Sequence, residues 1–360
     1  MVAPKAYPVF NTSVEAVFGG AEVDIYFLAT ELAKDPDLAV TVIVGDYGQD
    51  ALEMREAVQL VKGIDLSGSQ SVAALQLWRA LKLANSHVYM IKTISPGVPL
   101  VVAFCRVHRR AFVYRTSSGI EYDRAFFQDH PFTGWLFKRA LRSADLVLAQ
   151  TQQAADGLRR LSLAAVQVVP NAHRLDPLQT AQRDCVLWVG RSDAIKGPQI
   201  FIDLARRLPE QQFVMICQKA TGDNAYENLV RRAKAIGNLE FIERVPFGQA
   251  SCYFRRAKVL VNTSRSEGFP NTFIHAWAQA VPVLSLLVDP DSIISREGIG
   301  LCACGSIGRL VEGLRWILED DRYIQMGLQA RRYAERTHDI AKVIQIYKRL
   351  ISGIVRSYDA

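Results

Sequence analysis

The sequence has 360 residues, of which 49% are hydrophobic and 22% are charged. These proportions are typical of a folded globular chain and exclude a disordered, collagen-like or disulfide-scaffold protein. At roughly 100–200 residues per domain, the length predicts two domains. No stretch approaches the roughly 18–20 apolar residues of a membrane helix, and the N-terminus lacks the apolar run of a secretory signal. We therefore expect a cytoplasmic protein with free cysteine thiols.

The formal net charge of +7 is concentrated between residues 104 and 142. Aromatic residues such as Phe132 and Trp135 alternate there with basic ones. This pattern suits a peripheral contact with an anionic membrane, on its inner face, or with an anionic acceptor. The alternative is a solvated helix face above ordinary core aromatics. The basic residues are Arg106, Arg109, Arg110, Arg115, Arg124, Lys138, Arg139 and Arg142.

Short runs of Val, Leu and Ile alternate with helical patterns along the whole chain, which predicts α/β structure with parallel sheets. The first run is only MVAP, so either this strand is stunted or the true start lies upstream of Met1. Strands are expected at residues 1–4, 40–45, 87–91, 112–115, 146–149 and 166–169, and then at 185–189, 212–217, 239–242, 259–262 and 283–286.

Three further segments define the organisation. Residues 20–34 carry apolar side chains at spacings of three and four, which predicts a helix against a sheet. The polar, proline-containing stretch 169–184 is typical of a domain junction. The tail 321–358 has the pattern of two long amphipathic helices, with a break near His338.

Three loops carry residues suited to a phosphorylated ligand. Gly19 and Gly20 precede a helix, where backbone N–H groups attract anions. Arg191 and Lys196 follow a predicted strand and have the cationic groups to hold a diphosphate. Glu267 stands just before another helix, where its carboxylate is suited to sugar hydroxyls. Each loop alone is also compatible with an ordinary turn or a solvated charge.

Together these segments resemble the retaining glycosyltransferases of family 4. The resemblance rests on five motifs in order: Gly-Gly-Ala-Glu (19–22), Val-Pro-Asn (169–171), Val-Gly-Arg-x4-Lys-Gly (189–197), Ser-Glu-Gly-Phe-Pro-Asn (266–271) and Ala-Val-Pro-Val (280–283). It implies a GT-B fold, with two Rossmann-like domains across a cleft and a C-terminal helix that returns to the first domain. The implied domains are residues 1–172 with 340–360, on the acceptor side, and residues 173–339, which bind the nucleotide sugar.

The same resemblance implies roles for individual residues. Arg191 and Lys196 would bind the donor diphosphate, and Glu267 would contact the donor sugar. Fixed cations can stabilise the departing diphosphate without a metal ion, so no metal or other cofactor is expected. The remaining implied donor-binding residues are Gly19, Gly20, Gly190, Gly268, Phe269, Pro270, Asn271, Thr272 and His275.

Two positions depart from the family pattern. His275 stands where the family has the second glutamate of Glu-x7-Glu, which binds the nucleotide ribose. Arg115 stands where the family often has a histidine near the anomeric carbon. Arg115 is either part of the site or in a structural ion pair with Glu121 or Asp123. His275 either faces the nucleotide or packs at a helix–sheet interface.

The sequence therefore predicts an enzyme that transfers a sugar from a nucleoside diphosphate to a glycan or lipid-linked acceptor, in the synthesis of a cell-surface polysaccharide. The alternative is a degenerate GT-B protein that binds nucleotide sugar, or a partner, without turnover. A dinucleotide-dependent oxidoreductase is disfavoured because the Gly-x-Gly-x-x-Gly fingerprint is absent. No nucleic-acid partner is predicted.

Overall fold

The computed structural model describes residues 1–161, 163 and 165–359; at 124, 125, 247 and 359 the description covers the backbone. The chain divides into two compact units, which are described separately. Unit 1 contains Met1–Arg174 and the C-terminal segment from Ile340, and unit 2 contains Leu175–Asp339. The predicted junction between residues 172 and 173 lies two residues before this division. Ala360 lies outside the described residues.

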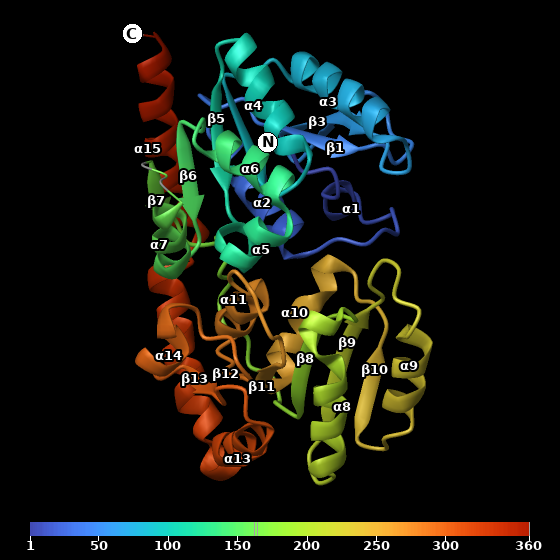
Figure 1. Cartoon of the computed structure of the whole chain (residues 1–360). Coiled ribbons are helices and arrows are strands. Elements are labelled where there is room, and N and C mark those ends of the chain that lie inside the picture. The colour runs from blue at the N-terminus through green and yellow to red at the C-terminus, as the bar shows by residue number, and fades with distance from the viewer. Residues whose placement is uncertain (162, 164, 360) are drawn as a thin grey trace. The chain divides into compact units, whose positions relative to one another are not determined.

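Unit 1 is an α/β layer structure whose strands have helices packed against them (Figure 1). Its strands are β1 (Thr41–Gly45), β2 (Leu52–Arg55), β3 (Val58–Ile64), β4 (Val88–Lys92), β5 (Ala111–Arg115), β6 (Leu146–Ala149) and β7 (Val166–Val168). Its helices are α1 (Tyr7–Phe10), α2 (Gly20–Leu32), α3 (Gln70–Ala84), α4 (Gly97–Val107), α5 (Arg124–Asp129), α6 (Pro131–Leu141), α7 (Gln152–Arg160) and α15 (Ile340–Asp359).

The strands of unit 1 form two sets, with the orders β2-β3-β1 and β4-β5-β6-β7. All pairings are parallel except that of β2 with β3. The expected strand at 1–4 is reduced to Val2, which makes single parallel bridges to Ile43 in β1 and Ile91 in β4 and so connects the two sets. It extends no further because Pro4 lacks an N–H donor and the chain then turns into α1.

The last helix, α15, belongs to unit 1 although it follows unit 2 in the sequence. It packs against α2 and β5, and buries Ile340, Val343, Ile344 and Tyr347. Lys348 also pairs with Asp35 beyond the end of α2, at 2.6 Å. No helix in the described part of the chain is long and apolar enough to cross a bilayer.

Unit 2 is a six-stranded parallel sheet with helices on both faces (Figure 1). Its strands are β8 (Cys185–Arg191), β9 (Phe213–Gln218), β10 (Leu239–Ile242), β11 (Ala257–Asn262), β12 (Val283–Ser285) and β13 (Gly300–Cys302). Its helices are α8 (Pro198–Arg207), α9 (Tyr226–Lys234), α10 (Ala250–Arg256), α11 (Asn271–Ala278), α12 (Ile293–Arg296), α13 (Ile307–Leu318) and α14 (Arg322–Thr337).

Alternate residues of these strands enter two separate hydrophobic cores. Val186 and Trp188 pack with α8, α9 and α13, while Cys185 and Leu187 pack with α10, α11 and α14. This double burial explains why the strands read as continuous apolar runs in the sequence.

The strand order of unit 2 is β10-β9-β8-β11-β12-β13. The chain therefore runs outward from β8 through β9 to β10, and then returns to the other side of β8 with β11. In open α/β sheets, ligands bind beyond the carboxyl ends of the strands at such a reversal. The loops after β8 and β11 meet at this point, and they are the loops that carry Lys196 and Glu267.

Candidate functional site

The two loops at the reversal of unit 2 are joined by an ion pair. Lys196 Nζ lies 2.5 Å from Glu267 Oε1. The hydroxyl of Ser264 donates a hydrogen bond of 2.7 Å to the same carboxylate oxygen. The side chains of Lys196 and Glu267 are only 24% and 14% exposed. The structure thus brings together two residues that the sequence separates by 71 positions.

Hydrogen bonds of the Thr263 side chain hold the two loops together. The Thr263 hydroxyl donates to the carbonyl oxygen of Lys196 at 2.7 Å and accepts a 2.9 Å hydrogen bond from the Trp188 indole. Gly197 has a φ of +61°, and a Cβ there would lie 2.7 Å from the carbonyl oxygen of Thr263. Glycine is therefore required by both the conformation and the close approach of the loops.

Arg191 ends β8 and is the more accessible of the two candidate diphosphate ligands. Its side chain is 42% exposed and pairs with Asp193 at 2.9 Å. An exposed ion pair of this kind is weak, so the guanidinium can be recruited by an anion at little cost. Gly190, just before it, packs so closely on Trp188 that a Cβ would lie 2.7 Å from the ring.

The segment before α11 presents its backbone rather than its side chains. Phe269 is buried against the rings of Trp277 and His338, which leaves only its main chain for a ligand. Gly268, Asn271 and Thr272 are half-buried, and Pro270 is buried. The first turn of a helix directs N–H groups outward, as phosphate binding requires.

His275 is half-buried on α11, and its ring stacks on Phe254 of α10 with centroids 5.4 Å apart. One face of the imidazole is therefore covered by α10. The ring is not enclosed in the core, unlike its neighbours Ile274 and Ala276.

In unit 1, Gly19 and Gly20 lie at the start of α2, as predicted. The Glu22 carboxylate accepts a 2.8 Å hydrogen bond from the Gly19 N–H, which fixes the first turn. One turn later, Asp24 is buried and pairs with two cations, Lys92 at 2.6 Å and Arg115 at 3.2 Å.

Arg115 is fully buried, and its guanidinium donates hydrogen bonds to groups from two segments, α2 and residues 169–171. It donates to Asp24, to the carbonyl oxygens of Val169 and Pro170, and to Asn171 Oδ1 at 2.6 Å. Its cation also lies 5.5 Å from the ring centroid of Tyr347.

Arg115 is thus in a structural ion pair, as one of the two alternatives had it. Its partner is Asp24, however, so the expected partners Glu121 and Asp123 were wrong. Sequence reasoning also overlooked Asp24 and Lys92, which form the buried pair. Each interrupts an apolar run, Asp24 in a helix and Lys92 at the end of a strand, and that interruption was the available signal.

Electrostatics within this cluster are strong because water is excluded. Burial alone raises the pKa of Asp24, but the Lys92 and Arg115 cations outweigh it and the pKa falls below its usual value. Burial lowers the pKa of Lys92, and the Asp24 carboxylate only partly offsets this. Two cations against one carboxylate give the carboxyl edge of the β4–β5 pair a buried positive charge.

Glu121 is, with Asp24, a buried carboxyl group among the described side chains of unit 1. Its oxygens accept hydrogen bonds from the backbone N–H of Ser117 at 3.1 Å and from the Ser117 hydroxyl at 2.9 Å. Burial raises the pKa of Glu121 to about 7, although these hydrogen bonds act in the opposite direction.

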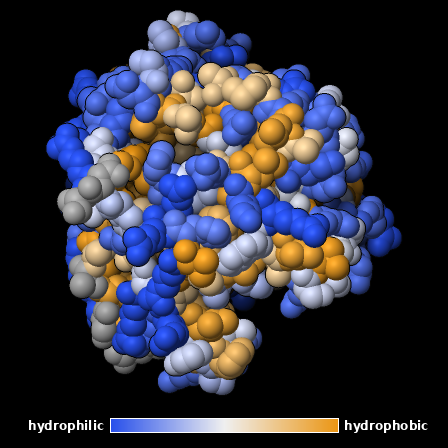
Figure 2. All heavy atoms as spheres, turned by 90° about the horizontal axis from the view of Figure 1, so that it is seen from above, coloured by the Kyte–Doolittle hydropathy of each residue, from blue (hydrophilic) through white to orange (hydrophobic). Residues whose placement is uncertain are grey.

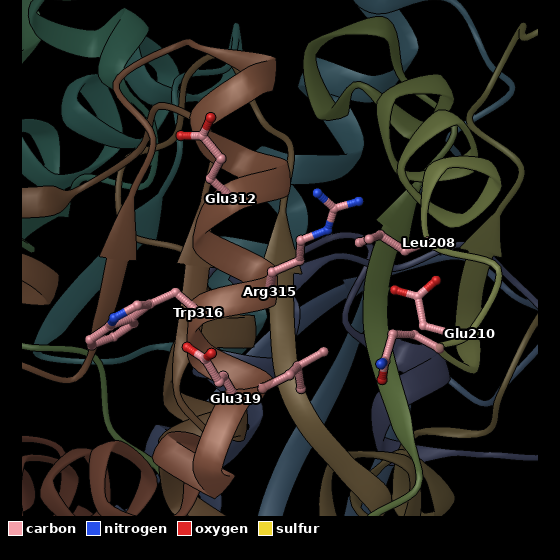
Figure 3. Close-up of a pocket in the computed structure, with 8 residues that line it drawn as sticks. Leu208, Glu210, Glu312, Arg315, Trp316 and Glu319 are labelled. Carbon is pink, nitrogen blue, oxygen red and sulfur yellow. The ribbon is translucent and has the colours of Figure 1, made fainter.

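A pocket of about 520 Å³ in unit 2 contains none of the predicted site residues (Figure 3). It lies between α13 and the turn after α8, near the start of β9, and therefore at the amino ends of the strands. Arg315 extends toward Leu208 there, and Glu210, Glu312 and Glu319 contribute three carboxylates. Its position away from the reversal point separates it from the Lys196–Glu267 pair.

Comparison with known proteins identifies the class. Residues 18–176 match the model described as "Glycosyltransferase Family 4", and residues 183–320 match "Glycosyl transferases group 1". The chain belongs to the family 4, group 1 glycosyltransferases. A D-inositol 3-phosphate glycosyltransferase of Corynebacterium efficiens is 28% identical over 45% of this chain. The match with this chain spans 41% of the length of that relative and 50% of the length of a second curated relative.

Solved structures show the same fold over nearly the whole chain. The sucrose-phosphate synthase of Thermosynechococcus elongatus has a TM-score of 0.79 and 18% identity, with 98% of both chains covered. WaaG, a glycosyltransferase involved in lipopolysaccharide biosynthesis, has a TM-score of 0.67 and 16% identity over 94% of this chain and 97% of its own. The pneumococcal O-GlcNAc transferase GtfA, solved with UDP and GlcNAc, has a TM-score of 0.65 and 12% identity over 86% of this chain and 64% of its own. The fold is GT-B.

Proposed function

We propose that the protein is a retaining glycosyltransferase that moves a sugar from a nucleoside diphosphate to a glycan or lipid-linked acceptor, in the synthesis of a cell-surface polysaccharide. The observation that carries the proposal is the ion pair between Lys196 Nζ and Glu267 Oε1, 2.5 Å apart. The pair lies where the strand order of the parallel sheet reverses, which is where such sheets bind ligands. The UDP complex of GtfA and the lipopolysaccharide role of WaaG support the substrate classes.

The chemistry assigned to the cations is stabilisation of the leaving group. As the anomeric bond breaks, negative charge accumulates on the diphosphate. Arg191 is suited to two of its oxygens at once and Lys196 acts as a point charge. In this proposal Lys196 exchanges part of its contact with Glu267 for the phosphate, and no metal ion is needed.

Glu267 is assigned to the donor sugar. It stands between the cation and the start of α11, and one of its oxygens is already fixed by Lys196 and Ser264. Its other oxygen is the acceptor assigned to sugar hydroxyls. Gly19 and Gly20 remain proposed donor contacts from unit 1, on the strength of the resemblance.

A second candidate is a GT-B protein that binds the donor without turnover. The position of Arg115 favours it, because a fully buried guanidinium held by Asp24, Asn171 and two carbonyl oxygens is committed to the structure of unit 1. In this candidate the donor site is retained and the step near the anomeric carbon is lost.

Peripheral attachment to the inner face of the membrane is proposed from α6. Phe132 and Trp135 are 73% and 57% exposed there and stack with centroids 6.4 Å apart, while Arg139 covers the Trp135 ring at 5.9 Å. Exposed aromatic rings beside cations suit the interface of an anionic bilayer. Figure 2 shows that hydrophobic side chains reach the surface among hydrophilic ones on the end of the molecule seen from above.

A transfer assay tests the proposal. The chain is incubated with nucleotide sugars and with lipid-linked or oligosaccharide acceptors, and the product is analysed by NMR. The expected product has the same anomeric configuration as the donor. A product of inverted configuration contradicts the retaining mechanism, and donor binding with no transfer or hydrolysis supports the second candidate.

A further inference from the structure

A second cavity lies wholly within unit 1, at the amino end of β5. It has a volume of about 380 Å³ and lies where the end of α4, the start of β5 and the last turn of α15 meet. Arg115 ends β5 and the cavity is at its start, so roughly 13 Å of strand separates them, at about 3.3 Å per residue. The cavity is therefore remote from the Asp24 cluster at the carboxyl ends of the strands.

Three arginines line this cavity: Arg106, Arg109 and Arg110. Among the described side chains, no ion pair includes any of them. Arg106 donates to the Ser143 hydroxyl at 2.5 Å and Arg110 donates to Asn85 Oδ1 at 2.8 Å. A guanidinium has five N–H donors, so most of their donor capacity remains.

The lining also contains one carboxylate, Asp145, whose oxygens have neutral partners. One oxygen accepts the Phe112 N–H at 2.7 Å, and the other accepts the Tyr358 hydroxyl at 2.9 Å. These contacts fix Asp145 to β5 and to α15. Among the described lining residues, three arginines against one aspartate leave an excess of two positive charges.

The backbone at Arg109 is unusual for an arginine. Its φ is +51°, and the Arg110 N–H donates to the Cys105 carbonyl oxygen at 2.8 Å, which is the closing bond of a Schellman turn after α4. Glycine is the favoured residue at this position, because a side chain there is strained. The sequence nevertheless places an arginine here, beside two others.

We propose that this cavity binds a phosphate group, through the guanidinium groups of Arg106, Arg109 and Arg110. Arginine forks match the oxygens of a phosphate, and hydroxyls from Ser143, Ser357 and Tyr358 line the same space. The phosphate belongs either to a small soluble molecule or to a lipid headgroup. The site is distinct from the donor site and does not depend on the proposed transferase activity.

The test uses the full-length Arg191→Ala/Lys196→Ala variant as parent, so that phosphate binding at the proposed donor site does not interfere. Inorganic phosphate is titrated by calorimetry at constant ionic strength, and Arg109→Gly is compared with the parent. Glycine relieves the strained φ, so the variant is expected to be at least as stable. Loss of one charge-assisted pair is expected to weaken phosphate binding roughly 10-fold or more.

Arg142→Gln is the matched control, because it removes the same charge from the basic stretch but does not line the cavity. It is expected to leave phosphate affinity within about twofold. Equal losses in Arg109→Gly and Arg142→Gln, or no saturable phosphate binding in the parent, would overturn the proposal.

Vesicles identify the source of the phosphate. Co-sedimentation compares vesicles of phosphatidylcholine alone with vesicles that contain one quarter phosphatidic acid. If the ligand is a lipid headgroup, Arg109→Gly weakens binding to the phosphatidic acid vesicles by at least several-fold more than Arg142→Gln does, because only Arg109 lines the cavity. If the ligand is soluble, inorganic phosphate binds and Arg109→Gly leaves vesicle binding unchanged. Both outcomes support the site.

Discussion

Lys196 and Glu267 form an ion pair of 2.5 Å between the loops that follow two neighbouring strands, β8 and β11. The chain reverses its direction across the sheet between these strands. The pair therefore lies where a parallel sheet leaves room for a ligand beyond its carboxyl edge. The Lys196 cation at this position is suited to the diphosphate of a nucleotide sugar, and the Glu267 carboxylate is suited to the hydroxyls of its sugar.

Arg191→Ala and Lys196→Ala are each expected to reduce transfer while the fold is retained. A charge-assisted hydrogen bond to phosphate contributes about 1.5–3 kcal/mol, which corresponds to a loss of roughly 10- to 150-fold in kcat/KM. Both side chains are partly exposed, so little packing is lost.

The matched control is Arg206→Ala, which removes an exposed arginine paired with Asp203 near the end of α8 in the same unit, away from the carboxyl ends of the strands. Circular dichroism and melting temperature verify the fold, and initial rates measure transfer. Wild-type rates in either active-site variant contradict the diphosphate assignment.

Gly197→Ala is expected to damage both stability and activity. An alanine at φ +61° is strained by about 1–2 kcal/mol, and its Cβ would also lie 2.7 Å from the Thr263 carbonyl oxygen, so the loop carrying Lys196 must shift. Gly222→Ala is the control, because Gly222 has a φ of +77° with no atom within 4 Å of the added Cβ. Urea unfolding should show the larger loss for Gly197→Ala; equal losses with unchanged activity would mean that the close approach does not position Lys196.

The architecture of unit 2 was accessible from sequence because its strands are buried on both faces and therefore read as apolar runs. The expected strand at 239–242 has the observed bounds of β10, and the helix expected just after Glu267 corresponds to α11. The short edge strand β13 was missed because Gly300–Cys302 is too short to show a pattern.

In unit 1 the prediction was less complete for a physical reason. β2 pairs antiparallel at the edge and is largely exposed, so its residues show no apolar run, and β3 beside it was missed as well. The motifs predicted which loops carry the candidate site, but not the contact of Lys196 with Glu267. Nor did they reveal the burial of Arg115 beside Asp24. The charge that interrupts the apolar run at Asp24 indicates a buried polar group, but a local pattern does not show which distant residue pairs with it.

The carboxyl group of Glu121 is expected to make stability depend on pH. Its pKa rises from 4.5 in the unfolded chain to about 7 in the fold, so the folded state holds the proton more tightly. The resulting stabilisation is complete below pH 4.5 and is lost as the pH rises through 7. Its size is about 3 kcal/mol at 1.36 kcal/mol per unit.

Glu121→Gln removes this contribution because the amide does not titrate. Urea unfolding of both proteins between pH 4.5 and 8 should show the wild type losing about 3 kcal/mol relative to the variant. Parallel curves for the two proteins would show that Glu121 titrates normally in the fold.

His275→Glu tests whether this position faces the nucleotide. The substitution restores the usual family residue, whose carboxylate is suited to two ribose hydroxyls. If His275 is at the ribose position, nucleotide affinity is retained or increased and the melting temperature changes little. His275→Gln serves as the control of similar size without charge. A sharply lowered melting temperature with unchanged nucleotide affinity would instead make the stacking on Phe254 its main role.

The most direct measurement of the central claim is a thermal-shift panel with the uridine, guanosine, adenosine, cytidine and thymidine diphosphates and their sugar conjugates. A ligand present at 100 times its dissociation constant stabilises the fold by about 2.7 kcal/mol. We predict that at least one nucleotide raises the melting temperature of the wild type and that Lys196→Ala reduces this shift. No shift with any nucleotide or nucleotide sugar at millimolar concentration would contradict the assignment of the Lys196–Glu267 site to a nucleotide-sugar donor.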